Sequence, residues 1–259
     1  MGDTSAARLG ALIQDLVREL TAVTPPPRAL PYLGLEHASG TGFHLLDALS
    51  TRGVFRKYEL VLELGTGLGG SARYLAARLG CDVVARTTSA GDAAAAATLG
   101  RRTALHAHVR VTAASADALP FRPARFTHVW IVEALPRLPD ATAALAEAHR
   151  VLRPGGYLAV QDLVLPERGR EVAVHGWRFA RAAERVTGIE TAGFVEIQHR
   201  EVTAEATERS ARVLAAREHL LRRLRADPLL AALAAEREAL ATALAGGRLR
   251  VVQLLARRP

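Results

Sequence analysis

The chain has 259 residues, of which 49% are hydrophobic, and a formal net charge of +8. This length suits a single α/β domain with additions, and the apolar content is sufficient for a full core. No apolar run reaches the roughly 18 residues of a membrane span, and the N-terminus lacks a secretory pattern. Cys81 is the only cysteine, which excludes an internal disulfide and a cysteine metal cluster. We therefore expect a cytoplasmic protein without a bound metal.

The positive charge raises the question of nucleic-acid binding. Lys57 is the only lysine, and the arginines are spread along the chain without interleaved aromatic residues. Binding of single strands needs such aromatic platforms. The charge therefore favours a solvated basic surface, and we expect no nucleic-acid partner.

The N-terminal region is predicted to be helical, and an alternation of strands and helices follows it. Apolar spacing predicts a helix over Ala6–Leu20, three prolines at 25–27 end it, and a second helix is expected over Phe43–Ser50. The next predicted strands are Glu59–Leu64, Asp82–Ala85, Val109–Ala113, His128–Val132 and Tyr157–Asp162. The helices between and after them are Gly70–Leu79, Asp92–Leu99, Ala141–Leu152 and Val172–Thr187. This order predicts a doubly wound α/β sheet with helices on both faces.

The pattern changes after Gly193. Phe194–Val202 and Leu249–Leu255 are expected to be the sixth and seventh strands of a mostly parallel sheet. Between them lies a helix-rich insertion, about 204–244, which is interrupted at Asp227-Pro228. The insertion is expected to form a lid or an oligomer face, and its helices, including Leu214, Leu220, Leu221 and Leu224, are expected to form either that lid or a dimer seam. We divide the chain into an N-terminal helical cap, residues 1–50, and a main domain, residues 51–259.

The most informative motif is Glu63-Leu-Gly-Thr-Gly-Leu-Gly-Gly70, at the junction of a predicted strand and helix. Glycines in such a turn adopt left-handed angles and let a ligand approach the main chain. A pyrophosphate site needs bare amides and a positive helix end, so the carboxylate of Glu63 disfavours a dinucleotide. The same carboxylate suits a cofactor with an ammonium group, which points to S-adenosylmethionine.

Three more segments occur in the same order as in a known family. They are Asp117-Ala-Leu-Pro-Phe121, Phe126-Thr-His-Val-Trp130 and Arg150-Val-Leu-Arg-Pro-Gly-Gly156, and Ala192-Gly193-Phe194 precedes the sixth strand. With the glycine turn, these segments resemble the class I S-adenosylmethionine-dependent methyltransferases, and most closely the tocopherol, sterol and cyclopropane-forming branch. The resemblance implies a Rossmann-like fold and assigns residues 51–259 to the methyltransferase domain.

The resemblance also implies a set of cofactor-binding residues. In such a site the backbone of the glycine turn lies close to the methionine part of the cofactor. Glu63 lies under the amino group of the cofactor or orders the turn, and Asp117 accepts a hydrogen bond from the adenine amino group. Ala118 and Leu119 wall the ring. The full set of positions is Glu63, Gly65, Thr66, Gly67, Gly69, Thr87, Thr88, Asp92, Asp117, Ala118 and Leu119.

The chain departs from the family pattern at three positions. Thr87 stands where many members have a ribose-binding acid, and Asp92 either replaces that contact or caps the following helix. Thr127 replaces an aspartate that braces loops in the family. Arg137 replaces a histidine that acts as a base in some members, which arginine cannot do. Arg137 is expected to pair with Asp140 on the surface, or with an acidic substrate.

These observations predict a methyltransferase for a small-molecule acceptor. His175 and Arg137 are the candidate catalytic residues, and His37 and His44 are further candidate bases. Two alternatives stay open. One is a methyltransferase-like protein that binds the cofactor or a partner without methyl transfer. The other is an NADP oxidoreductase, in which Arg86 would meet a ribose phosphate.

Overall fold

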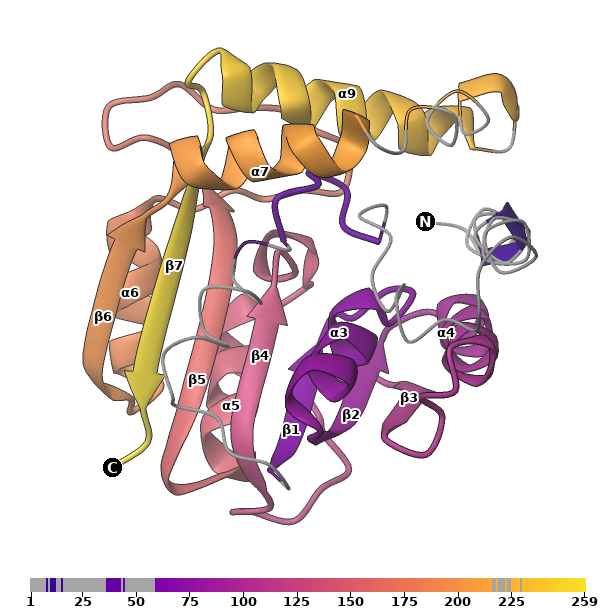
Figure 1. The fold of residues 1–259 in the computed structure, drawn as a ribbon. Coiled ribbons are helices and arrows are strands. Elements are labelled where there is room, and N and C mark those ends of the chain that lie inside the picture. Colours follow the sequence, from indigo (N-terminus) through magenta and orange to yellow (C-terminus); the bar gives the residue numbers. More distant parts are fainter. Residues whose placement is uncertain are drawn as a thin grey trace.

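The computed structural model describes residues 8, 10–12, 15, 36–42, 44, 59–215, 218, 222, 225–228 and 230–259. A helix follows each of the first six strands except β3, which leads directly through a loop to β4, as Figure 1 shows. The strands are β1 (Leu60–Leu64), β2 (Asp82–Thr87), β3 (Val109–Ala113), β4 (Phe126–Val132), β5 (Leu152–Val164), β6 (Val195–Glu201) and β7 (Arg250–Arg257). The helices are α3 (Gly70–Leu79), α4 (Ala90–Arg102), η1 (Leu135–Arg137), α5 (Ala141–Val151), α6 (Ala182–Thr191), α7 (Thr203–Ala215) and α9 (Ala231–Ala245).

The strands form one seven-stranded sheet in the order β3-β2-β1-β4-β5-β7-β6. Strands β1 to β5 pair in parallel, whereas β7 runs antiparallel to both β5 and β6. The mostly parallel sheet expected from the sequence is confirmed. The chain winds outward from β1 to β3 and then returns to β4 on the other side of β1. Ligands of such sheets bind at this switch point, outside the carboxyl ends of the strands.

Each face of the sheet has its own apolar core, because neighbouring residues of a strand point to opposite faces. Val61 of β1 packs in a cluster with Ala72 and Leu75 of α3. Leu62 and Leu64 pack in a second cluster that includes Leu145 of α5 and Ile189 of α6. The expected helices on both faces are therefore confirmed. These two layers fix β1 and α3, and so fix the turn between them.

The helix predicted over Val172–Thr187 is wrong. The helix of this region, α6, begins only at Ala182, and the residues from 171 to 180 form no helix. Gly176 has a φ of +77°, and Trp177 is buried in a cluster with Leu240 of α9. The apolar spacing of this segment therefore reflects contacts with the distant helical insertion rather than a helix of its own.

Helices α7 and α9 lie across the carboxyl ends of β4 and β5, as Figure 1 shows. They pack on the sheet through a cluster that includes Ala206, Leu240 and Val251, and the described residues between 203 and 245 are mostly helical, as expected. Among the described residues, no helix is long and apolar enough to cross a membrane.

Several N-terminal predictions cannot be compared with the structure. Residues 8, 10–12 and 15 are helical within the predicted Ala6–Leu20 helix. The remainder of that helix, the prolines, nearly all of Phe43–Ser50 and the proposed seam residues Leu220, Leu221 and Leu224 lie outside the described residues, as does the side chain of Leu214. The boundary between the cap and the main domain thus stays a prediction.

Candidate functional site

The glycine turn after β1 has the conformation that the sequence predicts. Gly65, Gly67 and Gly69 have φ values of +75°, +51° and +75°, which other residues rarely adopt. The amides of Gly65 and Thr66 donate to the carbonyl of Arg86 at 2.9 and 3.0 Å, which ties the turn to β2. A Cβ atom at Gly65 would lie 2.2 Å from the Cβ of Ala134, whereas at Gly67 the nearest atom of the described residues would be the Glu36 carbonyl oxygen, 3.9 Å away. Gly67 therefore presents bare backbone with space in front of it.

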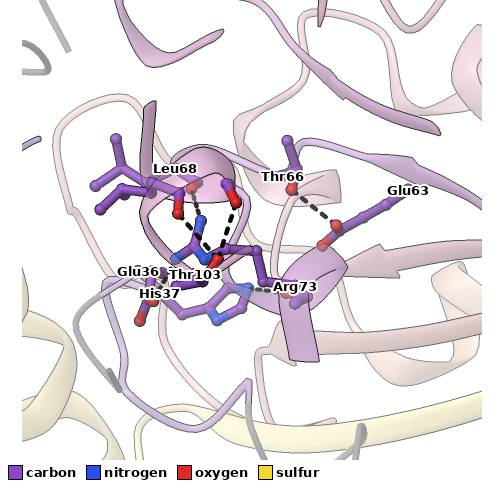
Figure 2. A network of polar contacts seen from close by, with 10 residues as sticks. Glu36, His37, Glu63, Thr66, Leu68, Arg73 and Thr103 are labelled. Atoms are coloured by element: carbon purple, nitrogen blue, oxygen red, sulfur yellow. Dashed lines mark hydrogen bonds and ion pairs between the residues drawn. The ribbon is translucent and has the colours of Figure 1, made fainter. Parts of the chain in front are cut away.

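Glu63 orders this turn. Its side chain is buried, and Oε2 accepts a 2.7 Å hydrogen bond from the hydroxyl of Thr66, as Figure 2 shows. Burial raises the pKa of the Glu63 carboxyl, and the hydroxyls of Thr66 and Ser71 and the charges of His37 and Arg73 oppose that rise. Of the two roles expected for Glu63, the structure thus displays the second, in which the carboxylate holds the turn.

A segment before the sheet covers the turn, and this contact was not foreseen from the sequence. We call residues 36–42 the strap. Arg73 of α3 donates to the Leu68 carbonyl at 2.6 Å and forms a 3.0 Å ion pair with Glu36 (Figure 2). His37 shares a 3.0 Å hydrogen bond with the hydroxyl of Ser71. A Cβ atom on Gly70 would lie 2.6 Å from Cγ of Glu36, so the strap needs a glycine there.

The end of β2 combines the residues proposed for the ribose. Thr87 is buried and its hydroxyl donates to Asp92 at 3.4 Å, while Thr88 is exposed. Ser89 caps α4, because its hydroxyl accepts from the Asp92 amide at 3.2 Å and the helix begins at Ala90. The alternative in which Asp92 caps this helix is therefore wrong. Its carboxylate lies beside Thr87, where it can accept a hydrogen bond from a ligand hydroxyl.

The loop after β3 presents the residues proposed for the adenine. Asp117 and Ala118 are exposed and Leu119 is buried. Two residues of α5 hold this loop by hydrogen bonds. Glu147 accepts from the Leu119 amide at 2.7 Å, and Arg150 donates to the Leu119 carbonyl at 3.0 Å. The Arg150 segment has the structural role that the sequence predicts, and the exposed Asp117 carboxylate accepts a hydrogen bond from the hydroxyl of Ser115.

Arg86 has a structural role in the fold. Its guanidinium donates to the hydroxyl of Thr112 and lies over the ring of Phe121, 4.9 Å from the centroid. Burial lowers the pKa of this guanidinium. At the end of β2 it is Thr87, not Arg86, that contacts Asp92. Arg86, the residue on which the NADP alternative depends, thus packs against Thr112 and the Phe121 ring.

The two candidate catalytic residues occupy different surroundings. His175 is exposed on the turn before Trp177, and nothing in the structure tests its proposed role. Arg137 lies 5.3 Å from the Trp177 ring centroid and 3.3 Å from a carboxylate oxygen of Glu236. The expected pair with Asp140 is wrong, since Asp140 caps α5 through the Ala143 amide. Arg137 instead joins the loop after β4 to α9.

Glu133 is a site residue that the sequence interpretation passed over. It follows β4 directly, is 4% exposed and has a φ of +54°, which is unusual for a residue with a side chain. Its carboxylate accepts hydrogen bonds from Ser39 and Thr41 of the strap and from Gln161 of β5. Such strained residues cluster at functional sites. The signal in the sequence was a carboxylate at the end of a central strand.

Comparisons with known proteins agree with this geometry. Residues 62–160 match the family model described as "Methyltransferase domain". Methyltransferase GfsG from Streptomyces halstedii is 34% identical over 105 residues, which is 40% of this chain and 38% of that protein. The chloroplastic tocopherol O-methyltransferase of Arabidopsis thaliana is 34% identical over 113 residues, 40% of this chain and 30% of that protein. The match thus spans less than half of either relative.

The likeness to a solved structure extends further along the chain. The crystal structure of the [4+2]-cyclase SpnF aligns with a TM-score of 0.70 and 27% identity, and covers 83% of this chain and 80% of that one. The shared region is thus far larger than residues 62–160. A chain similar to methyltransferases in sequence is also similar to a cyclase in structure.

Proposed function

We propose that this chain, whose residues 62–160 match the family model described as "Methyltransferase domain", transfers a methyl group from S-adenosylmethionine to a small-molecule acceptor. The observation that carries the proposal is the glycine turn at the switch point, with open backbone at Gly67. The acidic residues Asp92, in the first turn of α4 after β2, and Asp117, in the loop after β3, follow the next two strands of the sheet.

The residues present fit the cofactor of this family. The turn around Gly67 would take the methionine part, Thr87, Thr88 and Asp92 the ribose, and Asp117 with Ala118 the adenine. When bound, the cofactor supplies a methyl group on a positively charged sulfur, which is an excellent leaving group. The protein then has to align the acceptor and exclude water. The strap and helices α7 and α9 are placed for that role at the carboxyl ends of the central strands.

The acceptor is expected to contact the helical regions outside the central sheet. We propose that the N-terminal cap, residues 1–50, and the insertion at about 204–244 together shape its pocket. His175 stays a candidate base. Arg137 is bonded to Glu236, so its proposed role is to hold α9 against the loop after β4 or to meet an acidic acceptor.

An assay for the release of S-adenosylhomocysteine tests the proposal. Purified protein would be incubated with S-adenosylmethionine and panels of amines, phenols, alcohols, thiols and electron-rich alkenes. We expect release above the acceptor-free rate with at least one class. Binding of the cofactor without release in any panel would favour the alternative that follows.

The second candidate is an enzyme or binding protein that keeps the cofactor without transferring its methyl group. Two observations favour it: the structural likeness to a [4+2]-cyclase, and Arg137, which cannot act as a base, at the position of the family's histidine. The two candidates share the cofactor site and differ in release of S-adenosylhomocysteine.

We further propose a cytoplasmic location and a homodimer formed through the C-terminal helices. The buried, single cysteine Cys81 is consistent with a reducing compartment. Among the described residues, Val195 is the only large apolar side chain counted as exposed. That residue lies on β6, so the proposed seam on the C-terminal helices rests on the sequence alone, and light scattering tests it.

A further inference from the structure

The buried carboxylate of Glu133 has hydrogen-bond donors but, among the residues that the structure describes, no positively charged partner. Ser39 donates to Oε2 at 2.5 Å, Thr41 donates to Oε1, and the Gln161 amide donates to Oε1 at 3.2 Å. All three donors are neutral. Hydrogen bonds to the charged form favour it, so this arrangement is suited to holding a negative charge in place.

Three other buried carboxylates among the described residues, those of Asp162, Glu36 and Glu63, have cations beside them. Asp162 forms a 2.5 Å ion pair with Arg185, Glu36 pairs with Arg73, and the charges of His37 and Arg73 act on Glu63. No lysine, arginine or histidine among the described residues forms an ion pair with Glu133. The charge of Glu133 even contributes to raising the pKa of Asp162. Buried charges are ordinarily paired, so Glu133 lacks the cation that its surroundings call for.

The position of Glu133 indicates where that cation would come from. Glu133 directly follows β4 and precedes Ala134, whose Cβ lies 2.2 Å from where a Cβ atom on Gly65 would be. It therefore lies at the switch point between β1 and β4, beside the turn assigned to the methionine part of the cofactor. The strap closes over it from the other side through Ser39 and Thr41.

We propose that Glu133 is the counter-charge for the positively charged sulfur of S-adenosylmethionine, and this inference rests on the proposed function. A fixed carboxylate in a site of low polarity attracts a cation more strongly than it would in water. The product, S-adenosylhomocysteine, has a neutral sulfur and gains nothing from that charge. Glu133 would therefore favour the charged cofactor over the neutral product.

Titration calorimetry with the two ligands tests this directly, because they differ by one methyl group and one charge. In Glu133→Gln we expect affinity for S-adenosylmethionine to fall about tenfold or more, while affinity for S-adenosylhomocysteine changes less than about threefold. Ser39→Ala is the matched control: it removes a donor and keeps the charge, so the ratio of the two affinities should stay near that of the wild type.

Equal losses for both ligands in Glu133→Gln would mean a structural role for the carboxylate and would overturn the proposal, as would two unchanged affinities. If Glu133→Gln does not fold, the affinities of Thr41→Val for the two ligands test the proposal instead. Thr41→Val leaves the charge with one donor fewer, so the preference for S-adenosylmethionine must be kept or increased, and a decrease contradicts the proposal. Failure of the proposed function is a distinct result, since the wild-type protein would then bind neither ligand.

Discussion

Glu36 and Arg73 form an ion pair of 3.0 Å in which their side chains are 0% and 2% exposed. Arg73 belongs to the helix that follows the glycine turn, and it also donates to the Leu68 carbonyl within that turn. The carbonyl of His37, the next strap residue, accepts a 2.8 Å hydrogen bond from Arg237 of α9. The strap thus connects the cofactor turn to the helical insertion.

Loss of this buried pair should destabilise the protein strongly. In Arg73→Met the carboxylate of Glu36 loses the cation that pairs with it in the interior, which costs about 3–5 kcal/mol. Urea unfolding at neutral pH measures the change in the free energy of unfolding. Arg212→Met is the control, because the Arg212–Glu208 pair is 3.5 Å long and exposed, so its loss should cost less than about 1 kcal/mol. Equal costs would contradict the structural role assigned to Arg73.

Alanine at two glycines of the turn should have different effects. Gly65→Ala brings its Cβ within 2.2 Å of Ala134, and overpacking together with the left-handed φ should cost about 2–4 kcal/mol. Gly67→Ala meets only the left-handed penalty of about 1–2 kcal/mol. Thermal unfolding followed by circular dichroism distinguishes them. A Gly67→Ala variant as unstable as Gly65→Ala would show that the space in front of Gly67 is not open.

Substitutions at Asp92 and at Ser89 should affect different properties, ligand affinity in the first case and stability in the second. If Asp92 accepts a hydrogen bond from the ribose, Asp92→Asn should weaken S-adenosylhomocysteine binding about ten- to hundredfold. Ser89→Ala should instead cost about 1 kcal/mol of stability, since it removes the cap of α4, and leave affinity nearly unchanged. Calorimetry and urea unfolding on both variants test this. Unchanged affinity in Asp92→Asn would remove Asp92 from the ribose site.

Asp162 should give a defined dependence of stability on pH. Burial, the largest cause, raises its pKa from 3.8 to about 6, against the opposing charge of Arg185. The folded protein therefore binds this proton more tightly than the unfolded chain. Its contribution to stability is complete below pH 3.8 and is lost as the pH rises to about 6.

Comparison with Asp162→Asn isolates this effect. Relative to that variant, the wild-type protein should lose up to about 3 kcal/mol of unfolding free energy between pH 4 and pH 6.5. Urea titrations across this range measure the difference. A difference that stays constant with pH, or that grows in favour of the wild type, would contradict the assignment.

The sequence was informative where local patterns determine structure. The helix Gly70–Leu79 and the strand Val109–Ala113 have the predicted bounds, because glycines and alternating apolar residues mark them. The glycine turn was likewise recognisable, since each left-handed position carries the residue that tolerates it.

What was missed depends on contacts between distant parts of the chain. Glu36 and Arg73 are 37 positions apart, and Glu133 meets strap residues more than 90 positions away. No local pattern records such pairs. The segment before α6 was mistaken for a helix for the same reason, because Trp177 is buried against α9 and not against its own neighbours. Thus the cofactor side was largely predictable and the acceptor side was not.

The most direct test of the cofactor site is titration of S-adenosylhomocysteine into the wild-type protein and into Gly67→Asp. Gly67 has room for a side chain, and aspartate tolerates a left-handed φ better than most residues. The variant should therefore fold, with a carboxylate filling the space that the cofactor needs. We predict one-to-one binding to the wild-type protein and none to the variant. Absence of binding to well-folded wild-type protein, or equal affinity for both proteins, would contradict the assigned site.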